Sequence, residues 1–295
     1  MMTTNDFVLA ADIGGTHITS ALIDMTHRKI VLSSLVRNPV DANGSADTII
    51  NSWSNCLLKA KSNTGVSKIC LAMPGPFDYD KGISLMKGQN KYESLYKINS
   101  KELLAKALHT DPAQLFMEND AACFLQGEVF AGCAAGDYEK VIGVTLGTGL
   151  GTAVYRKGAC YSADLWSLPF GQGIAEDYLS TRWFVQRYQE LSGKTISGVK
   201  ELADEANTHT IAQLIFREFG KALAEFLLYF IEREQPETVV IGGNIANGYE
   251  LFKKEMEEVV TNNFSSVRIK KSLLGEQSAL FGAAGSWYNV LQRSL

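Results

Sequence analysis

Hydrophobic and polar positions along the chain form a pattern that predicts strands first and helices soon after. An apolar run begins at Phe7 and meets a pair of glycines, and a second apolar run ends at Asp24. The two runs predict neighbouring strands folded over a glycine turn. A further apolar run, Ile30 to Val36, predicts a third strand. We therefore expect the chain to open as a three-stranded meander.

Helical and strand patterns then follow one another to the end of the chain. Helices are expected over 47–61, 100–108, 121–130, 210–219, 221–233, 251–262 and 278–287, and strands over 66–73, 114–117, 236–241 and 267–270. The segment 140–155 predicts two strands joined by a glycine turn. Ser100 is the expected N-cap of its helix, and Gly220 either separates two helices or bends one. The polar segment from Ile83 to Tyr96 predicts no long element and could line a cleft.

Three glycine-containing turns stand at the ends of expected strands: Gly14-Gly15-Thr16, Gly147-Thr148-Gly149 and Gly242-Gly243-Asn244. Glycine carries no Cβ, so the backbone N–H groups of such a turn can approach an anion closely. Asp12 precedes the first turn and can hold Mg²⁺, directly or through water. A plain hairpin explains a single turn as well. Two turns about 133 positions apart instead predict two halves of one topology that hold a polyphosphate from both sides.

Composition narrows the class of protein. The 295 residues are 46% hydrophobic, enough to bury a full core over two domains of ordinary size. A net charge of −4 without a dense Lys/Arg block disfavours a nucleic-acid partner. Neither a leader before Phe7 nor an apolar run of ~18 residues is present, so we expect a cytoplasmic protein without membrane association. The five cysteines show no CxxC spacing, which predicts neither a disulfide framework nor a zinc site.

An acid at a strand-to-helix junction completes a recognisable set of motifs. Glu118-Asn119-Asp120 follows the expected strand at 114–117 and opens the next helix. With the three turns it resembles the actin/hexokinase/Hsp70 ATPase superfamily, the first two turns matching phosphate motifs and the third the adenosine motif. Within that superfamily, Glu118-Asn119-Asp120-Ala-Ala followed by Gly127-Glu128 is similar to the ROK family of repressors, open reading frames and sugar kinases. The likeness covers nearly the whole chain.

The resemblance implies an α/β fold of two ribonuclease-H-like domains with a nucleotide cleft between them. The smaller domain would be 1–120, completed by the helix at 278–295, and the larger would be 121–277. The implied reaction is ATP- and Mg²⁺-dependent phosphorylation of a hexose or N-acyl-hexosamine hydroxyl, with glucose-like sugars preferred. Family members are often dimers, so a homodimer is left open.

The resemblance also assigns roles to residues. Asp120 would be the general base, and Asp12 would organise Mg²⁺ through water. The expected sugar ligands are Asn90, Asn119, Asp120, Asp164 and Glu176, and the expected ATP and phosphate ligands are Asp12, Gly14, Gly15, Thr16, Gly147, Thr148, Gly149, Gly242, Gly243 and Asn244. Three alternatives stay open: Asn119 or Asp120 caps the helix, worth ~1 kcal/mol, Glu176 is only a first-turn acid, and Asp12 is a solvated turn acid.

One region departs from the family pattern. Family members carry a Glu-x-Gly-His motif and then a zinc-binding set of cysteines, whereas this chain has Asp164-Leu-Trp166-Ser167 and no such cysteines. Asp164 is matched to the glutamate and Ser167 to the histidine, and Trp166 adds bulk where the family has glycine. We therefore expect no zinc site, as in the subgroup of the family that lacks the zinc motif.

Other functions are weighed against the sugar kinase. A catalytically weak sugar-binding protein of the same fold would also fit the altered stretch at Asp164. A repressor is disfavoured, because the first strand begins at about Phe7 and leaves no room for a DNA reader. A glycoside hydrolase using Asp120 and Glu176 would leave the three glycine turns without a role.

Overall fold

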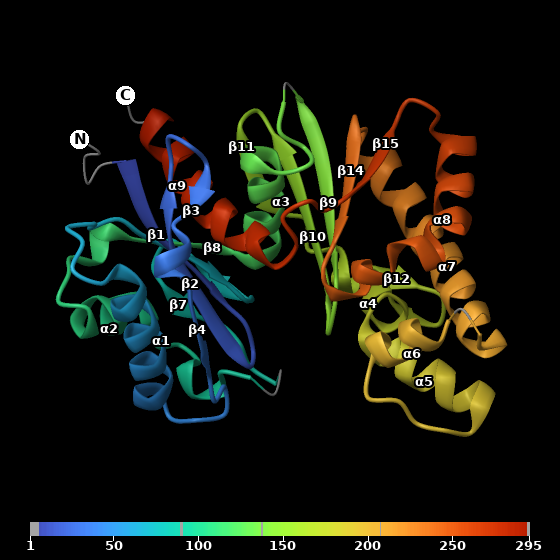
Figure 1. The fold of residues 1–295 in the computed structure, drawn as a ribbon, viewed down its shortest axis with the longest axis horizontal. Helices are drawn as coiled ribbons and strands as arrows, with labels where there is room; N and C mark the ends of the chain where they lie inside the picture. The colour runs from blue at the N-terminus through green and yellow to red at the C-terminus, as the bar shows by residue number, and fades with distance from the viewer. Residues whose placement is uncertain (1–5, 89–90, 137, 207, 294–295) are drawn as a thin grey trace. The chain divides into compact units, whose positions relative to one another are not determined.

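The computed structural model describes residues 6–88, 91–136, 138–206 and 208–293, and its chain forms two compact units (Figure 1). The first unit comprises Met1–Ala131 and Gln277–Leu295, and the second comprises Gly132–Glu276. The first unit continues to Ala131, whereas the sequence analysis expected its boundary after Asp120. The reason is that α3 (Asp120–Ala131) packs along α9 (Ser278–Arg293) within the first unit.

The sheet of the first unit has the strand order β3-β2-β1-β5-β8, with β4 also paired to β2. β1 is antiparallel to β2 and parallel to β5, which is parallel to β8. The strands are β1 (Phe7–Ile13), β2 (His17–Asp24), β3 (Lys29–Ile30), β4 (Val36–Pro39), β5 (Ile69–Met73), β6 (Phe77–Asp78), β7 (Ile83–Ser84) and β8 (Leu115–Asn119). Besides α3 and α9, the helices are α1 (Ala46–Lys61) and α2 (Ser100–Ala107).

The second unit repeats this topology in the order β11-β10-β9-β14-β15. Its first three strands are antiparallel and its last three parallel, as in the first unit. This likeness confirms the repeat that the two glycine turns predicted. The strands are β9 (Lys140–Leu146), β10 (Leu150–Arg156), β11 (Ala159–Ser162), β12 (Pro169–Phe170), β13 (Gly173–Ile174), β14 (Thr238–Gly242) and β15 (Arg268–Lys271), and the helices are α4 (Ala175–Tyr178), α5 (Thr181–Ser192), α6 (Val199–Glu205), α7 (Thr210–Glu234) and α8 (Tyr249–Asn263).

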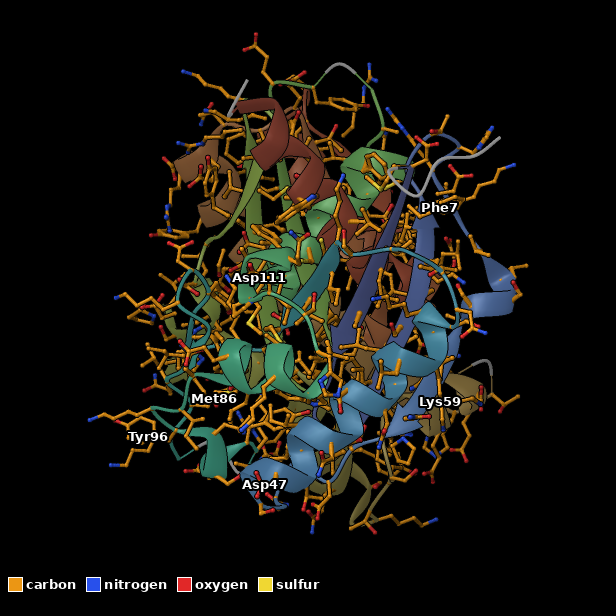
Figure 2. All side chains as sticks on the ribbon, turned by 90° about the vertical axis from the view of Figure 1, so that its left-hand side faces the viewer. Phe7, Asp47, Lys59, Met86, Tyr96 and Asp111 are labelled. Atoms are coloured by element: carbon orange, nitrogen blue, oxygen red, sulfur yellow. The ribbon has the colours of Figure 1, made fainter. Side chains whose placement is uncertain are left out.

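Helix α1 shows how local sequence and packing agree. The Ser45 side chain accepts the Thr48 N–H and caps the first turn. Asp47 lies in the first turn and Lys59 in the last, which suits the helix dipole (Figure 2). The inner face buries Trp53 with other apolar side chains in a core beside the sheet. Helix α1 thus covers 46–61 where the sequence predicted 47–61.

The third strand of the predicted meander is wrong in part. Residues 30–36 are divided among β3, a short 3₁₀ turn (Leu32–Ser34) and the start of β4. The Ser34 hydroxyl accepts the Leu22 N–H at 2.8 Å and donates to the Val31 carbonyl at 2.6 Å. The Ser34 hydroxyl therefore lies between the Leu22 N–H and the Val31 carbonyl, which would bond each other directly if the ladder continued. The strand is interrupted at this point.

The region around Gly220 is one continuous helix, α7, and not two. A Cβ at Gly220 would lie 2.6 Å from the Phe252 carbonyl oxygen of α8. Gly220 is therefore a point of close approach between two helices, which the sequence could not distinguish from a helix break.

The N-cap of α2 is Asn99 and not Ser100, because the Asn99 side chain accepts the Glu102 N–H at 3.1 Å. The Ser100 hydroxyl is buried without a hydrogen-bond partner in the described part of the chain. We expect Asn99→Ala to lower the free energy of unfolding by ~1 kcal/mol. Ser100→Ala should lower it by less or raise it, since the lost hydroxyl is unsatisfied. Urea denaturation of the two variants checks this, and equal losses would contradict the assignment of the cap.

Candidate active site

The first group of predicted site residues lies at one edge of the sheet of the first unit. In the parallel register, Asp12 on β1 pairs with Ala72 on β5, which pairs with Glu118 on β8. All three lie near the carboxyl ends of their strands, where open α/β sheets bind ligands. Asp12, the glycine turn after β1 and the start of α3 therefore share this edge.

The Gly14-Gly15-Thr16 turn is fixed by a residue far away in the sequence. Gly14 N–H donates to the His17 carbonyl at 2.9 Å, and the Tyr92 hydroxyl donates to the Gly14 carbonyl at 2.6 Å. Tyr92 is buried with its ring edge-on to Trp53, and burial raises the pKa of its hydroxyl to about 12. Gly15 and Thr16 remain exposed. Tyr92 thus holds the turn on its buried side, and Gly15 and Thr16 are accessible to solvent.

At the junction of β8 and α3, the two candidate residues have different partners. Asn119 Oδ1 accepts the N–H groups of Ala121 and Ala122 at 3.0 and 3.1 Å, so Asn119 caps α3. Its Nδ2 donates to the Tyr79 hydroxyl at 3.0 Å. Asp120 Oδ1 accepts the Ala121 N–H at 2.8 Å, and within the described residues the structure assigns no hydrogen bond to Oδ2. Asn119 therefore caps the helix, whereas Asp120 leaves one carboxylate oxygen outside the cap.

The surroundings of Asp120 favour its protonated form. Burial raises the pKa of the Asp120 carboxyl, and the Lys91 ammonium partly opposes this shift. Burial also raises the pKa of the neighbouring Glu118. The Lys91 side chain lies near Gly15, because a Cβ on that glycine would be 4.0 Å from Lys91 Cδ. Lys91 and Tyr92 both belong to the polar segment from Ile83 to Tyr96, which the sequence predicts could line a cleft, without a role for either residue.

The Gly147-Thr148-Gly149 turn of the second unit is held on both sides. The Thr181 N–H and hydroxyl both donate to the Gly147 carbonyl, at 2.8 and 2.9 Å. On the other side, Glu176 Oε2 accepts the Leu150 N–H at 3.0 Å. Glu176 therefore has a backbone partner in this turn besides its place in the first turn of α4.

The Gly242-Gly243-Asn244 turn lies against the turn at Gly147. Gly242 pairs with Thr145 in the parallel register of β14 and β9. Gly243 has a φ of +82°, and a Cβ there would lie 2.3 Å from the Leu146 carbonyl oxygen. Only glycine fits this position, so the second and third turns lie together at the carboxyl ends of β9 and β14.

The segment that departs from the family pattern, 164–167, is exposed except for Leu165. Asp164 adopts a left-handed conformation, and its Oδ1 accepts the Ser162 hydroxyl at 2.8 Å. Trp166 is 43% exposed on the short helix that follows. This segment joins α4 through the Ala175 N–H, which donates to the Leu168 carbonyl at 2.9 Å. Asn90, the remaining expected sugar ligand, lies outside the described residues.

These motifs occur in the order and topology of one known family. The sequence profile of the ROK family matches residues 8–163 and 171–289. The chain belongs to the ROK family. The only interruption of that match, 164–170, falls on the segment where the sequence departs from the ROK pattern.

Relatives and solved structures agree with the ROK assignment over nearly the full length. A glucokinase of Thermotoga maritima is 23% identical over 94% of this chain and 96% of its own. An N-acetyl-D-glucosamine kinase of Photobacterium profundum is 24% identical over 92% of this chain and 96% of its own. The structure of a ROK glucokinase from Streptomyces griseus in complex with glucose and AMPPNP is similar with a TM-score of 0.75 and 21% identity, covering 94% of this chain and 98% of that one.

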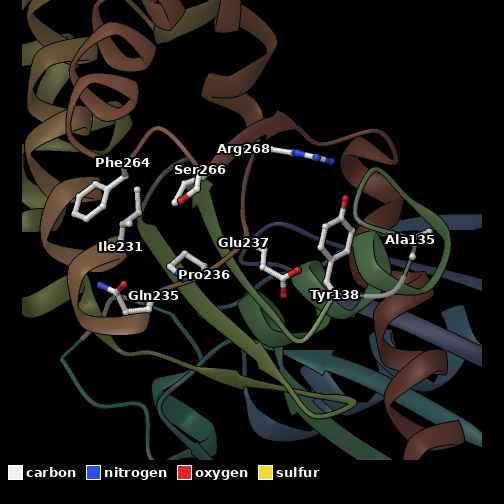
Figure 3. Close-up of a pocket in the computed structure, with 11 residues that line it drawn as sticks. Ala135, Tyr138, Ile231, Gln235, Pro236, Glu237, Phe264, Ser266 and Arg268 are labelled. Atoms are coloured by element: carbon white, nitrogen blue, oxygen red, sulfur yellow. The ribbon is translucent and has the colours of Figure 1, made fainter.

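A pocket of about 670 Å³ in the second unit lies away from the ROK motifs (Figure 3). Glu237 and Arg268 line it at the amino ends of β14 and β15, on the edge of the sheet opposite to the glycine turns. None of the predicted site residues lines this pocket. Among the described residues, no group of three or more His, Cys, Asp or Glu side chains could hold a metal ion. None of the described helices is both long and apolar enough to cross a membrane.

Proposed function

We propose that this protein is an ATP-dependent kinase that phosphorylates a hydroxyl of a hexose or N-acyl-hexosamine, with glucose-like sugars preferred. The observation that carries the proposal is the Asp120 carboxyl at the junction of β8 and α3, at the same sheet edge as Asp12 and the first glycine turn. The names of the related glucokinase and N-acetylglucosamine kinase support the same class of substrate.

In this proposal Asp120 accepts the proton of the attacking sugar hydroxyl. The hydroxyl oxygen forms a bond to the γ-phosphorus of ATP, the bond from that phosphorus to the bridging oxygen breaks, and ADP leaves. A base at this position contributes ~10²–10⁴-fold to such a transfer. Asn119 has two N–H groups on Nδ2. One donates to the Tyr79 hydroxyl, and the other can donate to the sugar. Asp164, Glu176 and Asn90 are proposed as further sugar ligands.

The glycine turns are proposed to bind the nucleotide. Backbone N–H groups at Gly15, Thr148 and Gly149 suit phosphate, with the Thr16 and Thr148 hydroxyls as further donors. The Gly14 and Gly147 N–H groups donate to the His17 and Gly149 carbonyls and fix the shape of the two turns. Gly242, Gly243 and Asn244 are proposed to contact the adenosine. A carboxylate at a strand end is the hard oxygen ligand that Mg²⁺ takes beside phosphates and water, so Asp12 fits the ion. Mg²⁺ bound there would neutralise phosphate charge.

A second candidate is a sugar-binding protein of this fold with weak catalysis. The match to the family breaks at 164–170, and the bulky Trp166 is exposed in that segment. This candidate predicts sugar binding without sugar-stimulated ATP consumption. A homodimer and a cytoplasmic location remain predictions from the sequence and the resemblance.

A coupled assay of ADP release tests the proposed kinase against the second candidate. Mg·ATP would be supplied with glucose, mannose, fructose, N-acetylglucosamine or N-acetylmannosamine, and sugar binding would be measured in parallel by calorimetry. We expect a sugar-dependent rate that is highest with a glucose-like sugar. Sugar binding without any stimulated rate would favour the weak sugar-binding protein.

The charge of Lys91 should set the acid limit of the activity. A base must be ionised to accept a proton, so kcat falls as the pH drops through the pKa of Asp120. Burial raises that pKa and Lys91 lowers it. Lys91→Met removes the stabilising positive charge, and we expect the acid limb of the kcat profile to move to higher pH.

The matched control is Lys87→Met, because Lys87 is an exposed lysine of the same segment. Its Nζ lies 5.4 Å from the centre of the Tyr96 ring. The pH profile of Lys87→Met should coincide with that of the wild type. An acid limb that stays in place or moves to lower pH in Lys91→Met would contradict the role of Lys91.

A further inference from the structure

The Glu176 carboxylate touches the backbone of the second glycine turn at two adjacent residues. Its Oε2 accepts the Leu150 N–H at 3.0 Å. A Cβ on Gly149 would lie only 2.7 Å from the same oxygen. The carboxylate is therefore packed directly against the turn, and a side chain at position 149 would displace it.

The turn is hydrogen-bonded to other chain segments at both of its ends. Thr181 holds the Gly147 carbonyl with its N–H and its hydroxyl, while Glu176 holds the Leu150 N–H. Both residues come from one short stretch of chain, α4 and the start of α5. Backbone N–H groups that already point at the place of an anion bind it without the cost of reorganising the turn. The hydrogen bonds of Glu176 and Thr181 at the two ends of the turn supply such preorganisation.

We propose that Glu176 is a positioning residue for nucleotide binding, which holds the Gly147–Gly149 turn in its phosphate-binding form through the Leu150 N–H. The inference rests on the proposed function, because it takes the turn as the nucleotide site. It goes beyond the expected role of Glu176 as a sugar ligand. A carboxylate that contacts only the sugar has no effect on nucleotide affinity when sugar is absent, whereas a carboxylate that holds the turn does.

Helix α4, which carries Glu176, is also bonded to the chain segment that follows Asp164. Its Ala175 N–H donates to the Leu168 carbonyl at 2.9 Å. A sugar bound beside Asp164 and Glu176 would then act on the helix that holds the turn. Any coupling of this kind is reciprocal between the two ligands.

The test measures Mg·AMPPNP binding by calorimetry without sugar. Glu176→Ala loses the acceptor for the Leu150 N–H, and we expect its affinity for AMPPNP to fall about tenfold. Glu176→Gln keeps an amide oxygen at that position and should bind AMPPNP within about twofold of the wild type. Asp177→Ala is the matched control on the same helix, because Asp177 bonds Ile174 N–H and Arg182 instead. An unchanged affinity in Glu176→Ala, or an equal loss in Asp177→Ala, would overturn the proposal.

Two further measurements separate this proposal from the proposed function and from simple misfolding. Amide hydrogen exchange in the wild type should show a protected Leu150 N–H, and rapid exchange there would overturn the proposal without any variant. Thr181→Val removes one of the two donors to Gly147 and should weaken AMPPNP binding by a smaller factor than Glu176→Ala. A wild type that phosphorylates sugar while Glu176→Ala loses only sugar affinity refutes the positioning role alone. A wild type that binds no nucleotide refutes both.

Discussion

Asp120→Asn is expected to lower kcat by ~10²–10⁴-fold while leaving the sugar affinity and the fold intact. The amide cannot accept the proton of the attacking hydroxyl, but its Oδ1 can still accept the Ala121 N–H that Asp120 accepts at 2.8 Å. Steady-state kinetics with Mg·ATP and calorimetry with the sugar measure the two effects separately. A variant with full activity would remove Asp120 from its proposed role.

The stability of Asp120→Asn gives a second readout. Burial raises the pKa of Asp120 in the folded protein above its unfolded value, so the ionised carboxylate opposes folding at neutral pH. The amide carries no charge and removes this effect, although it also loses the attraction of Lys91. We therefore expect a Tm at neutral pH that is equal to or above that of the wild type. Lost activity with retained stability is typical of a functional residue whose charged form is needed for activity but destabilises the fold.

Glu118→Gln is the matched control, because Glu118 is the neighbouring carboxyl whose pKa burial also raises. Its Oε1 accepts the Asn119 N–H at 2.8 Å, and a glutamine oxygen can do the same. Most of the activity should remain in this variant. Loss of transfer in Glu118→Gln but not in Asp120→Asn would identify Glu118 as the base.

Gly282→Ala is expected to destabilise the protein by roughly 3 kcal/mol or more. Alanine in a helix interior would ordinarily gain ~1 kcal/mol over glycine. A Cβ at position 282 of α9, however, would lie 1.6 Å from the Cys123 carbonyl oxygen of α3 and 2.4 Å from its carbonyl carbon. Both are backbone atoms, so one helix must move as a whole. Denaturant unfolding measures the loss, and an unchanged midpoint would contradict the close packing of α3 on α9.

Gly285→Ala is the control for this prediction within the same helix. A Cβ there would meet the Phe130 side chain at 3.3 Å and the Gln126 side chain at 3.5 Å. Side chains can shift by a few tenths of an ångström, so the free energy of unfolding should stay within ~1 kcal/mol of the wild type. Because α3 begins with Asp120, we also expect the folded fraction of Gly282→Ala to show a lower kcat than Gly285→Ala.

The sequence by itself determined the parts of this protein that depend on neighbours along the chain. Glycine turns after apolar runs gave the three turns at Gly14, Gly147 and Gly242, and the recurrence of the first in the second gave the shared topology of the two halves. The turns and the shared topology follow from backbone freedom and hydrophobic period, which act over a few residues. The role of Asp120 as the candidate base came instead from the resemblance of its motif to the ROK family.

The tertiary structure alone decided which groups hold these motifs in place. Tyr92 bonds the Gly14 carbonyl across 78 positions of sequence, and Glu176 bonds the Leu150 N–H across 26. Ser34 ends a strand by bonding Leu22, and Gly220 marks a contact with α8 where the sequence suggested a break. Each of these depends on chain segments that only folding brings together, and a local pattern does not record which distant partner satisfies a polar group or needs the space of a missing Cβ.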